Sequence, residues 1–311
     1  MCSARVARPS QFRYAQYSVT RARVGTKNQP ALAREANRGL LGASSKFIRA
    51  GAILALTASF CICVAAQQTK PKKRAPKPAP VPAAPPAAAP FHAGETLDFT
   101  GEWLKISGTV TARLIAVDQR PFFGKPCWHL QTQLHTNNPL RVLFPVDDQF
   151  DSYSAAADLQ GLQFEMYLHE SGKEQTNLLR LSSGADAVSV PPGATIVRVL
   201  PGTHDPLGFL YELRSVDWSK TSELRSPVFD GHNLYDVRAE LATRSASTQV
   251  AAGTFTATGI AIHVLQRGVE MANTKLTLWI AQDAARTPVL LEMELPIGFG
   301  RLELVHAANE K

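Results

Sequence analysis

Leu162-Gln-Phe-Glu-Met-Tyr-Leu-His169 decides the fold class, because its apolar side chains occupy every second position. In a β-strand these apolar side chains share one face, and the intervening polar side chains take the other. The same alternation recurs along Tyr235–Leu241, Leu276–Ile280 and Val289–Leu295. A buried face and a wet face on each strand are typical of antiparallel sheets.

Turn signals separate these strands. Asp230-Gly231 predicts a two-residue hairpin between Phe229 and the strand around Tyr235. Near Gly259 the apolar face of the strand changes sides, which predicts a bulge or bend that curls the sheet. Strands do not alternate with long helical segments, so the pattern argues against a parallel α/β fold.

One segment departs from the alternation: Asp205-Pro-Leu-Gly-Phe-Leu-Tyr-Glu-Leu-Arg-Ser-Val216. Asp205 suits the N-cap of a helix, and Pro206 suits its first position. The helix is apolar over much of its girth, so we expect it to be buried. We therefore predict a single mainly β domain over residues 91–311, a curved antiparallel sheet or open barrel wrapped around one short helix.

An apolar run over residues 47–66 precedes this domain. It follows Lys46 and Arg49 and ends in Val64-Ala65-Ala66, which suits a signal-peptidase cut. Its length lies at the short edge of what spans a bilayer. We predict a signal peptide or an uncleaved N-terminal anchor. The protein is then exported, and either periplasmic or anchored to the inner membrane facing the periplasm. Residues 1–46 are expected to form a disordered basic leader, unless the true start lies downstream.

Basic charge gathers ahead of the domain. Residues 67–90 are rich in Pro, Ala and Lys, and such a tether favours extended polyproline II over a packed core. The chain carries a net charge of +7, yet the excess of Lys and Arg over acids in the leader and tether is larger than this whole net charge. The remainder is acidic, which argues against nucleic acid as its partner.

Chemical motifs are sparse. Only Cys127 follows the proposed cut, so the mature chain has no internal disulfide. Cys127 and His129 share a strand face, predicted to be solvent-exposed or the wet lining of a half-barrel. A zinc site needs three or four ligands, and none follows at a diagnostic spacing. Phosphate-loop, dinucleotide and nucleophile-elbow motifs are missing from the sequence. We expect no metal, no cofactor and no enzymatic activity.

Three acids offer an alternative. Asp147, Asp148 and Asp151 crowd together, and glycoside hydrolases need two carboxyls across one cleft. The structural interpretation of this cluster is a polar hairpin or a wet strand face.

The helix supplies the candidate ligand-binding residues. Leu207, Leu210 and Tyr211 are predicted to border a concave apolar cavity. Arg214 lies three positions after Tyr211 and either ties the helix to the sheet or contacts an anionic headgroup. Trp279 falls on the polar side of its strand, where it caps the cavity or packs against the helix.

Several short segments recur together in order and spacing: Phe91–Phe99, Asp205–Arg214, Gly253–Phe255, Leu278–Asp283, Thr287–Val289 and Ile297-Gly298. With them, the chain from about Phe91 to Val305 resembles the bacterial exported family called domain of unknown function 3108. The resemblance implies a periplasmic or envelope-associated β-rich domain of unassigned activity. The architecture is also similar to the open barrels of outer-membrane lipoprotein carriers, in which a curved sheet holds a lipid.

Three functions follow from these observations. The first is a non-enzymatic envelope domain that binds an apolar or lipid-like ligand, or an envelope protein partner. The second is a glycan hydrolase that uses the acid cluster. The third is a structural assembly module, for which an exposed strand edge or apolar patch is the expected sign.

Overall fold

A computed structural model describes residues 89–184, 190–295 and 298–309. The predicted leader, the apolar run and nearly all of the tether lie outside the described residues. Within the described ranges, no helix combines the length and apolar character needed to cross a membrane.

Strands dominate the described chain. The strands are β1 (Glu95–Trp103), β2 (Ile106–Phe122), β3 (Lys125–Thr136), β4 (Asp147–Ala155), β5 (Gly161–Glu170), β6 (Lys173–Ser182), β7 (Thr195–Arg198), β8 (Glu223–Phe229), β9 (Leu234–Val250), β10 (Gly253–Gln266), β11 (Val269–Glu270), β12 (Lys275–Ala281), β13 (Pro288–Leu295) and β14 (Gly298–Asn309). The helices are α2 (Leu140–Leu143) and α3 (Pro206–Ser215).

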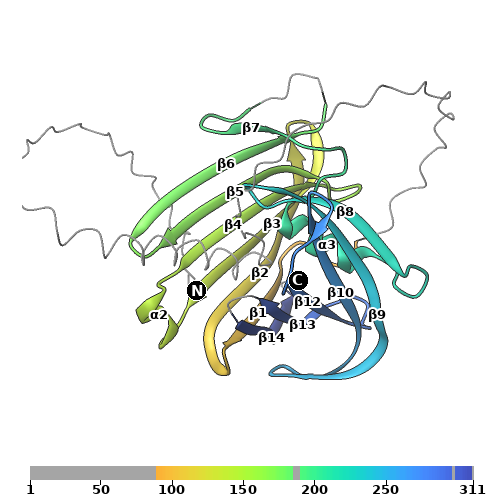
Figure 1. Ribbon diagram of the computed structural model, residues 1–311. Coiled ribbons are helices and arrows are strands. Elements are labelled where there is room, and N and C mark those ends of the chain that lie inside the picture. Colours follow the sequence, from red (N-terminus) through yellow and green to blue (C-terminus); the bar gives the residue numbers. More distant parts are fainter. Residues whose placement is uncertain (1–88, 185–189, 296–297, 310–311) are drawn as a thin grey trace, which may run out of the picture. The chain divides into compact units, whose positions relative to one another are not determined.

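These strands form one sheet in the order β7-β6-β5-β4-β3-β2-β1-β14-β13-β12-β10-β9-β8, with β11 paired to β10. Neighbours along the sheet are antiparallel, apart from the parallel pair β6–β7. The sheet curves around α3 (Figure 1). The predicted fold class, a curved antiparallel sheet around one short helix, is therefore confirmed.

The helix and the bend form where the sequence predicts them. Asp205 caps α3, because its side chain accepts hydrogen bonds from the backbone N–H of Leu207 and Gly208. The register of β10 against β9 shifts at Gly259. A Cβ at Gly259 would lie 3.0 Å from the Trp279 ring, so the bend also needs a residue without a side chain.

Two local expectations differ from the structure. The β8–β9 connection has four residues, Asp230–Asn233, because the Asp230 carboxylate accepts from the backbone N–H of both His232 and Asn233 and widens the turn. The one-turn helix α2 was not predicted, since four residues are too few for helical periodicity to show.

Part of the outer face is buried, where the alternation predicts a wet surface. Gln163 and Glu165 on β5 are 2% and 8% exposed. Aromatic side chains from the end of β2 lie over this region. The ring of Phe122 stacks on Tyr153 at 4.4 Å, and the Arg180 guanidinium lies 5.2 Å from Phe122. The β2 end therefore shields polar groups that would otherwise face water.

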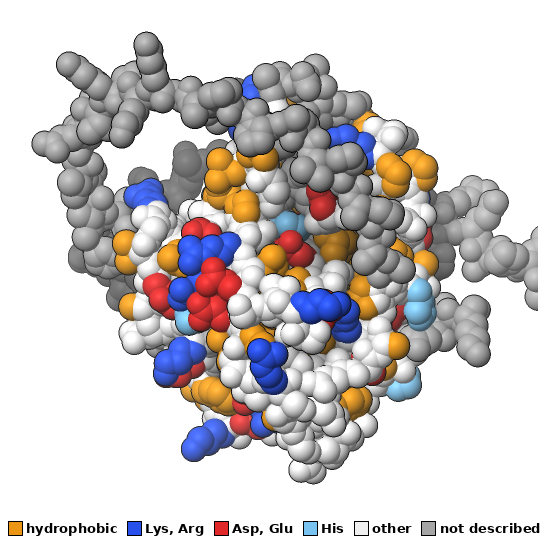
Figure 2. Space-filling view, turned by 90° about the vertical axis from the view of Figure 1, so that its right-hand side faces the viewer, with side chains coloured by type: hydrophobic (Ala, Val, Ile, Leu, Met, Phe, Trp, Pro, Cys, Tyr) orange, Lys and Arg blue, Asp and Glu red, His pale blue; other side chains and the backbone are white. Residues whose placement is uncertain are grey.

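Other outward side chains pair opposite charges. On β8, Arg225 Nε lies 2.7 Å from Glu223 Oε1, and on β9 Arg238 Nη1 lies 3.1 Å from Glu240 Oε1. Figure 2 shows one face of the molecule, on which acidic and basic side chains likewise lie side by side.

Candidate functional site

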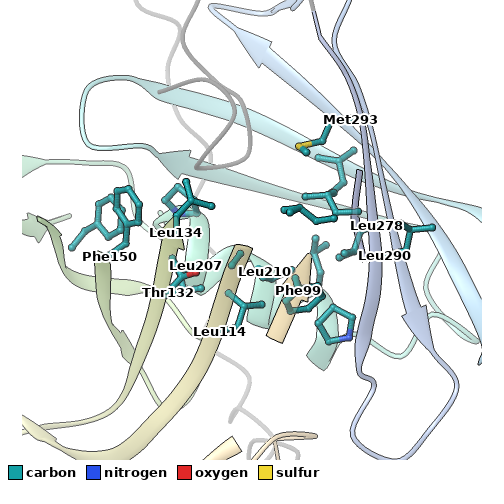
Figure 3. A pocket seen from close by; sticks show the side chains of 18 residues that line it. Phe99, Leu114, Thr132, Leu134, Phe150, Leu207, Leu210, Leu278, Leu290 and Met293 are labelled. Carbon is teal, nitrogen blue, oxygen red and sulfur yellow. The ribbon is translucent and has the colours of Figure 1, made fainter. Parts of the chain in front are cut away.

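The concave side of the sheet holds an apolar cavity against α3 (Figure 3). The volume of this cavity is about 100 Å³. The lining is apolar except for Thr132, whose hydroxyl donates to the backbone oxygen of Arg113 at 3.1 Å. The lining residues are Phe99, Ala112, Leu114, Thr132, Leu134, Phe150, Phe164, Pro206, Leu207, Leu210, Leu213, Ile262, Leu278, Pro288, Leu290, Leu291, Met293 and Leu302.

None of these lining side chains is ionisable. A cavity of this kind cannot supply a general acid, a base or a metal ligand from its own walls. It can only exclude water and accommodate an apolar group, as apolar pockets generally do.

Residues Thr203 and His204, here called the seam, hold α3 in place. The backbone N–H of Gly161 on β5 donates to Thr203 O at 3.0 Å. On the other side, His204 N donates to Pro227 O at 2.9 Å, and Phe229 N donates to His204 O at 2.8 Å. The seam thus links β5 to the edge strand β8. Because α3 begins just after it, the seam also fixes the position of the helix at the wall of the cavity.

The cap of α3 is completely buried. Ser152 on β4 donates a hydrogen bond of 2.6 Å to the Asp205 carboxylate. Burial raises the pKa of Asp205, although the hydrogen bonds from Ser152 and from the backbone of the helix act against the shift. Gly208 lets α3 approach this strand, because a Cβ there would lie 2.8 Å from Ser154 Oγ.

The predicted ligand-binding residues separate into two groups. Leu207 and Leu210 point into the cavity (Figure 3). The side chains of Tyr211 and Arg214, which also belong to α3, do not line the cavity and are fully buried elsewhere. Trp279 does not line it either. The ligand-binding role of all five residues stays a prediction.

Arg214 ties the helix to the sheet through a buried ion pair. Its Nη1 and Nη2 donate to the two carboxylate oxygens of Glu95 on β1 at 2.8 and 2.7 Å. Nη2 also donates to Ala285 O at 3.1 Å. The guanidinium lies 4.9 Å from the Tyr211 ring and 5.3 Å from the Phe91 ring. Arg214 is therefore saturated by protein groups.

Tyr211 and Trp279 pack elsewhere. Tyr211 meets Phe91 edge to face at 4.6 Å, and burial raises the pKa of its hydroxyl. The indole N–H of Trp279 donates to Glu292 Oε2 at 2.9 Å, and its ring fills the space that Gly259 leaves open.

A second cluster of polar side chains lies on the outer face. His129 Nε2 donates to Asp151 Oδ1 at 2.6 Å. Arg120 Nη2 lies 2.5 Å from the other ring nitrogen, His129 Nδ1, so the imidazole lies between Arg120 and Asp151. The predicted exposure of this face is wrong at His129, which is buried, and the thiol of Cys127 on the same face is buried as well. Burial raises the pKa of Cys127 to about 11, which makes it a poor nucleophile at neutral pH.

The three acids of the hydrolase alternative do not converge. Asp147 is bound by Arg141 at 2.7 Å and by His135, and the bond from Arg141 lowers its pKa. Burial alone would raise the pKa of Asp151, but bonds from three side chains, beginning with His129, leave it lowered.

Asp148 points to the opposite face of β4 from both of them. Its Oδ1 accepts from the backbone N–H of His169 at 2.9 Å. Among the described residues, no group of three or more His, Cys, Asp or Glu side chains is arranged to hold a metal ion.

Sequence reasoning missed most of the cavity wall. Phe150, Phe164, Leu278 and Met293 come from four strands spread over the sheet. Their alternation identifies a buried face, but only the curvature of the sheet brings these faces around one cavity.

Comparisons with known proteins find two exported-type or uncharacterised solved structures with low similarity and one matching family model. A β-barrel-like protein of domain of unknown function DUF1849 from Brucella abortus is 12% identical, with a TM-score of 0.47, over 69% of this chain and 97% of its own. A candidate lipoprotein from Parabacteroides distasonis is 10% identical, with a TM-score of 0.33, over 70% of this chain and 98% of its own. No curated protein matches the sequence. The model of the family "Protein of unknown function (DUF3108)" matches residues 96–305, and the chain therefore belongs to the DUF3108 family.

Proposed function

We propose that this protein is an exported, non-enzymatic domain that binds an apolar group, such as part of a lipid acyl chain, in the cavity against α3. One observation carries the proposal: every lining side chain but Thr132 is apolar, and the Thr132 hydroxyl is engaged by backbone. Water finds no free hydrogen-bond partners in such a cavity. An apolar group can therefore enter it without breaking any hydrogen bond between water and the protein.

The size of the cavity limits the occupant. An engineered cavity of about 150 Å³ lined by similar residues stays dry and binds benzene. The present cavity, at about 100 Å³, suits a few methylene groups rather than a whole lipid. The rest of such a lipid then lies outside the cavity, beyond the helix or between the strands.

Export rests on the sequence. The apolar run over residues 47–66 and the Pro-rich tether after it are typical of a chain that is moved out of the cytoplasm and held away from a membrane.

The acid cluster supports the hydrolase alternative poorly. Asp148 lies on one face of β4, while Asp147 and Asp151 lie on the other, and each carboxylate already accepts hydrogen bonds. Lowered pKa values for Asp147 and Asp151 also leave neither as a proton donor near neutral pH.

The proposal is tested with cavity-filling variants of the full chain. Leu210→Trp and Leu134→Phe each add bulk to a different wall. The control is Val269→Trp on β11, where the side chain is 71% exposed. Protein extracted from membranes in mild detergent is examined by native mass spectrometry, and binding of a dansyl-labelled fatty acid is followed by fluorescence.

We expect a bound apolar mass and probe binding in the parent and in the Val269→Trp variant, and loss of both in the two cavity variants. Circular dichroism and thermal unfolding check that the variants fold. An empty parent that binds no probe, or folded cavity variants that bind like the parent, would overturn the proposal.

A further inference from the structure

Exposed apolar side chains gather at one end of the sheet. Leu104 lies in the β1–β2 turn and Ile106 directly after it, Val142 and Leu143 lie on α2, and Phe299 is the second residue of β14. They are between 42% and 78% exposed. We call these five residues the rim.

Hydrogen bonds hold the parts of the rim together. The backbone N–H of Leu104 donates to Phe299 O at 3.0 Å. The side chain of Asn137, which leads into α2, donates to Gly108 O at 3.0 Å, and its backbone N–H donates to Thr109 O at 2.7 Å. The turn thus contacts β14 at Phe299, while β2, just beyond the turn, binds the residue that leads into α2.

The backbone of the β1–β2 turn adopts conformations that its residues disfavour. Leu104 and Lys105 have φ values of 51° and 66°, the left-handed conformations of a tight hairpin turn. Asn and Gly favour this geometry, whereas a leucine is strained in it. Leu104 contacts Gly298 but nevertheless remains 57% exposed. A strained and exposed leucine is a candidate for a contact outside the folded chain.

The chemistry around the turn identifies the contact. Lys105 lies at its apex between Leu104 and Ile106. Apolar side chains that flank a lysine can enter the boundary of a bilayer while the ammonium group stays among anionic headgroups. We propose that the rim docks on the surface of an anionic phospholipid bilayer, where an apolar ligand enters or leaves the protein; the exchange of a ligand rests on the proposed function.

The rim is coupled to the cavity by packing. Leu104 lies against Gly298, and Trp103 lies against Gly300, where a Cβ would approach its ring to 2.6 Å. Met293 reaches the same position at Gly300 and also lines the cavity. One layer of side chains therefore separates the rim from the cavity.

The tether allows this orientation. Phe91 packs on Trp128 and Tyr211, so the chain enters the domain at the beginning of β1, and the rim lies at the end of the same strand. Nine residues of β1 span about 30 Å at ~3.3 Å per residue. A segment with the length and Pro content of residues 67–90 is long enough to span about 70 Å when extended. A chain held in a membrane through residues 47–66 can thus turn its rim to that same membrane.

The test uses the full chain in bilayers of phosphatidylethanolamine and phosphatidylglycerol that carry a photoactivatable lipid. Mass spectrometry of digested protein locates the labelled segments, which separates rim labelling from labelling of residues 47–66. The double variant Leu104→Asp/Val142→Asp changes two exposed rim side chains. Its matched control, Ile196→Asp/Leu200→Asp, changes two exposed side chains at and just after β7, at the other end of the strands (Figure 1).

We expect labelling at the rim of the parent, a fall of about tenfold in the rim variant, corresponding to about 1.4 kcal/mol, and no change in the control. Bilayers of phosphatidylcholine alone should label the rim less, because Lys105 then loses its anionic partners.

A rim labelled no more than the segment Ile196–Leu200 would overturn the inference, as would a rim that instead crosslinks to a second copy of the chain. The cavity is assayed separately by native mass spectrometry. An occupied cavity with an unlabelled rim refutes only the docking of the rim on the bilayer. A labelled rim with an empty cavity refutes only the binding of an apolar ligand.

Discussion

Replacing Glu95 by alanine should be among the most damaging single changes in the domain. The Arg214 side chain is fully buried and Glu95 is 2% exposed, and two hydrogen bonds of 2.7 and 2.8 Å join them. Without Glu95 the guanidinium keeps two backbone carbonyls but has no counter-charge and no access to water. Removing one partner of such a pair costs about 3–5 kcal/mol.

The matched control lies on the same strand. Arg113 Nε lies 2.6 Å from Asp98 Oδ1, but the Arg113 side chain is 51% exposed. Water screens this pair, so Asp98→Ala should cost only about 0–1 kcal/mol. The two changes therefore compare similar contacts that differ chiefly in burial.

Urea unfolding followed by circular dichroism gives the free energy of unfolding for each variant. The double variant Glu95→Leu/Arg214→Met removes both charges and should recover most of the loss, because no uncompensated charge stays buried. The reasoning fails if Glu95→Ala costs no more than Asp98→Ala, or if the losses from changing Glu95 and Arg214 singly simply add in the double variant.

Three further outcomes follow from the same structure. Burial raises the pKa of Glu212, so its ionisation destabilises the fold as pH rises above the ordinary glutamate value of about 4.3; the Tm of Glu212→Gln relative to that of the parent should therefore increase as pH rises from that value, and a difference in Tm that does not change with pH would contradict this. Gly208→Ala should lower stability by about 1–3 kcal/mol despite a helix-propensity gain of about 1, because the new Cβ would lie 2.8 Å from Ser154 Oγ and 3.0 Å from Leu159 O; unfolding by urea decides the sign. With its pKa raised to about 11, Cys127 should react with iodoacetamide far more slowly in the folded protein than in urea, and equal rates by peptide mass spectrometry would refute its burial.

Local patterns in the sequence carried much of the fold. The alternation from Leu162 to Leu168 identified a strand, Asp205 and Pro206 marked the start of the helix, and Gly259 marked the bend. Each of these features depends on residues a few positions apart. Strand geometry, caps and bulges follow from steric preferences and hydrogen bonds over that range, so they can be predicted without knowing the partner strands.

Long-range partners could be found only in the folded chain. Arg214 meets Glu95 across 119 positions of sequence, and the helix side chains Leu207 and Leu210 meet strands from both halves of the sheet. Alternation tells which face of a strand is buried, but neither which strands are neighbours nor how far the sheet curves. Curvature decides whether apolar faces close into a packed core or leave a cavity, and it also decides which exposed side chains meet at the rim.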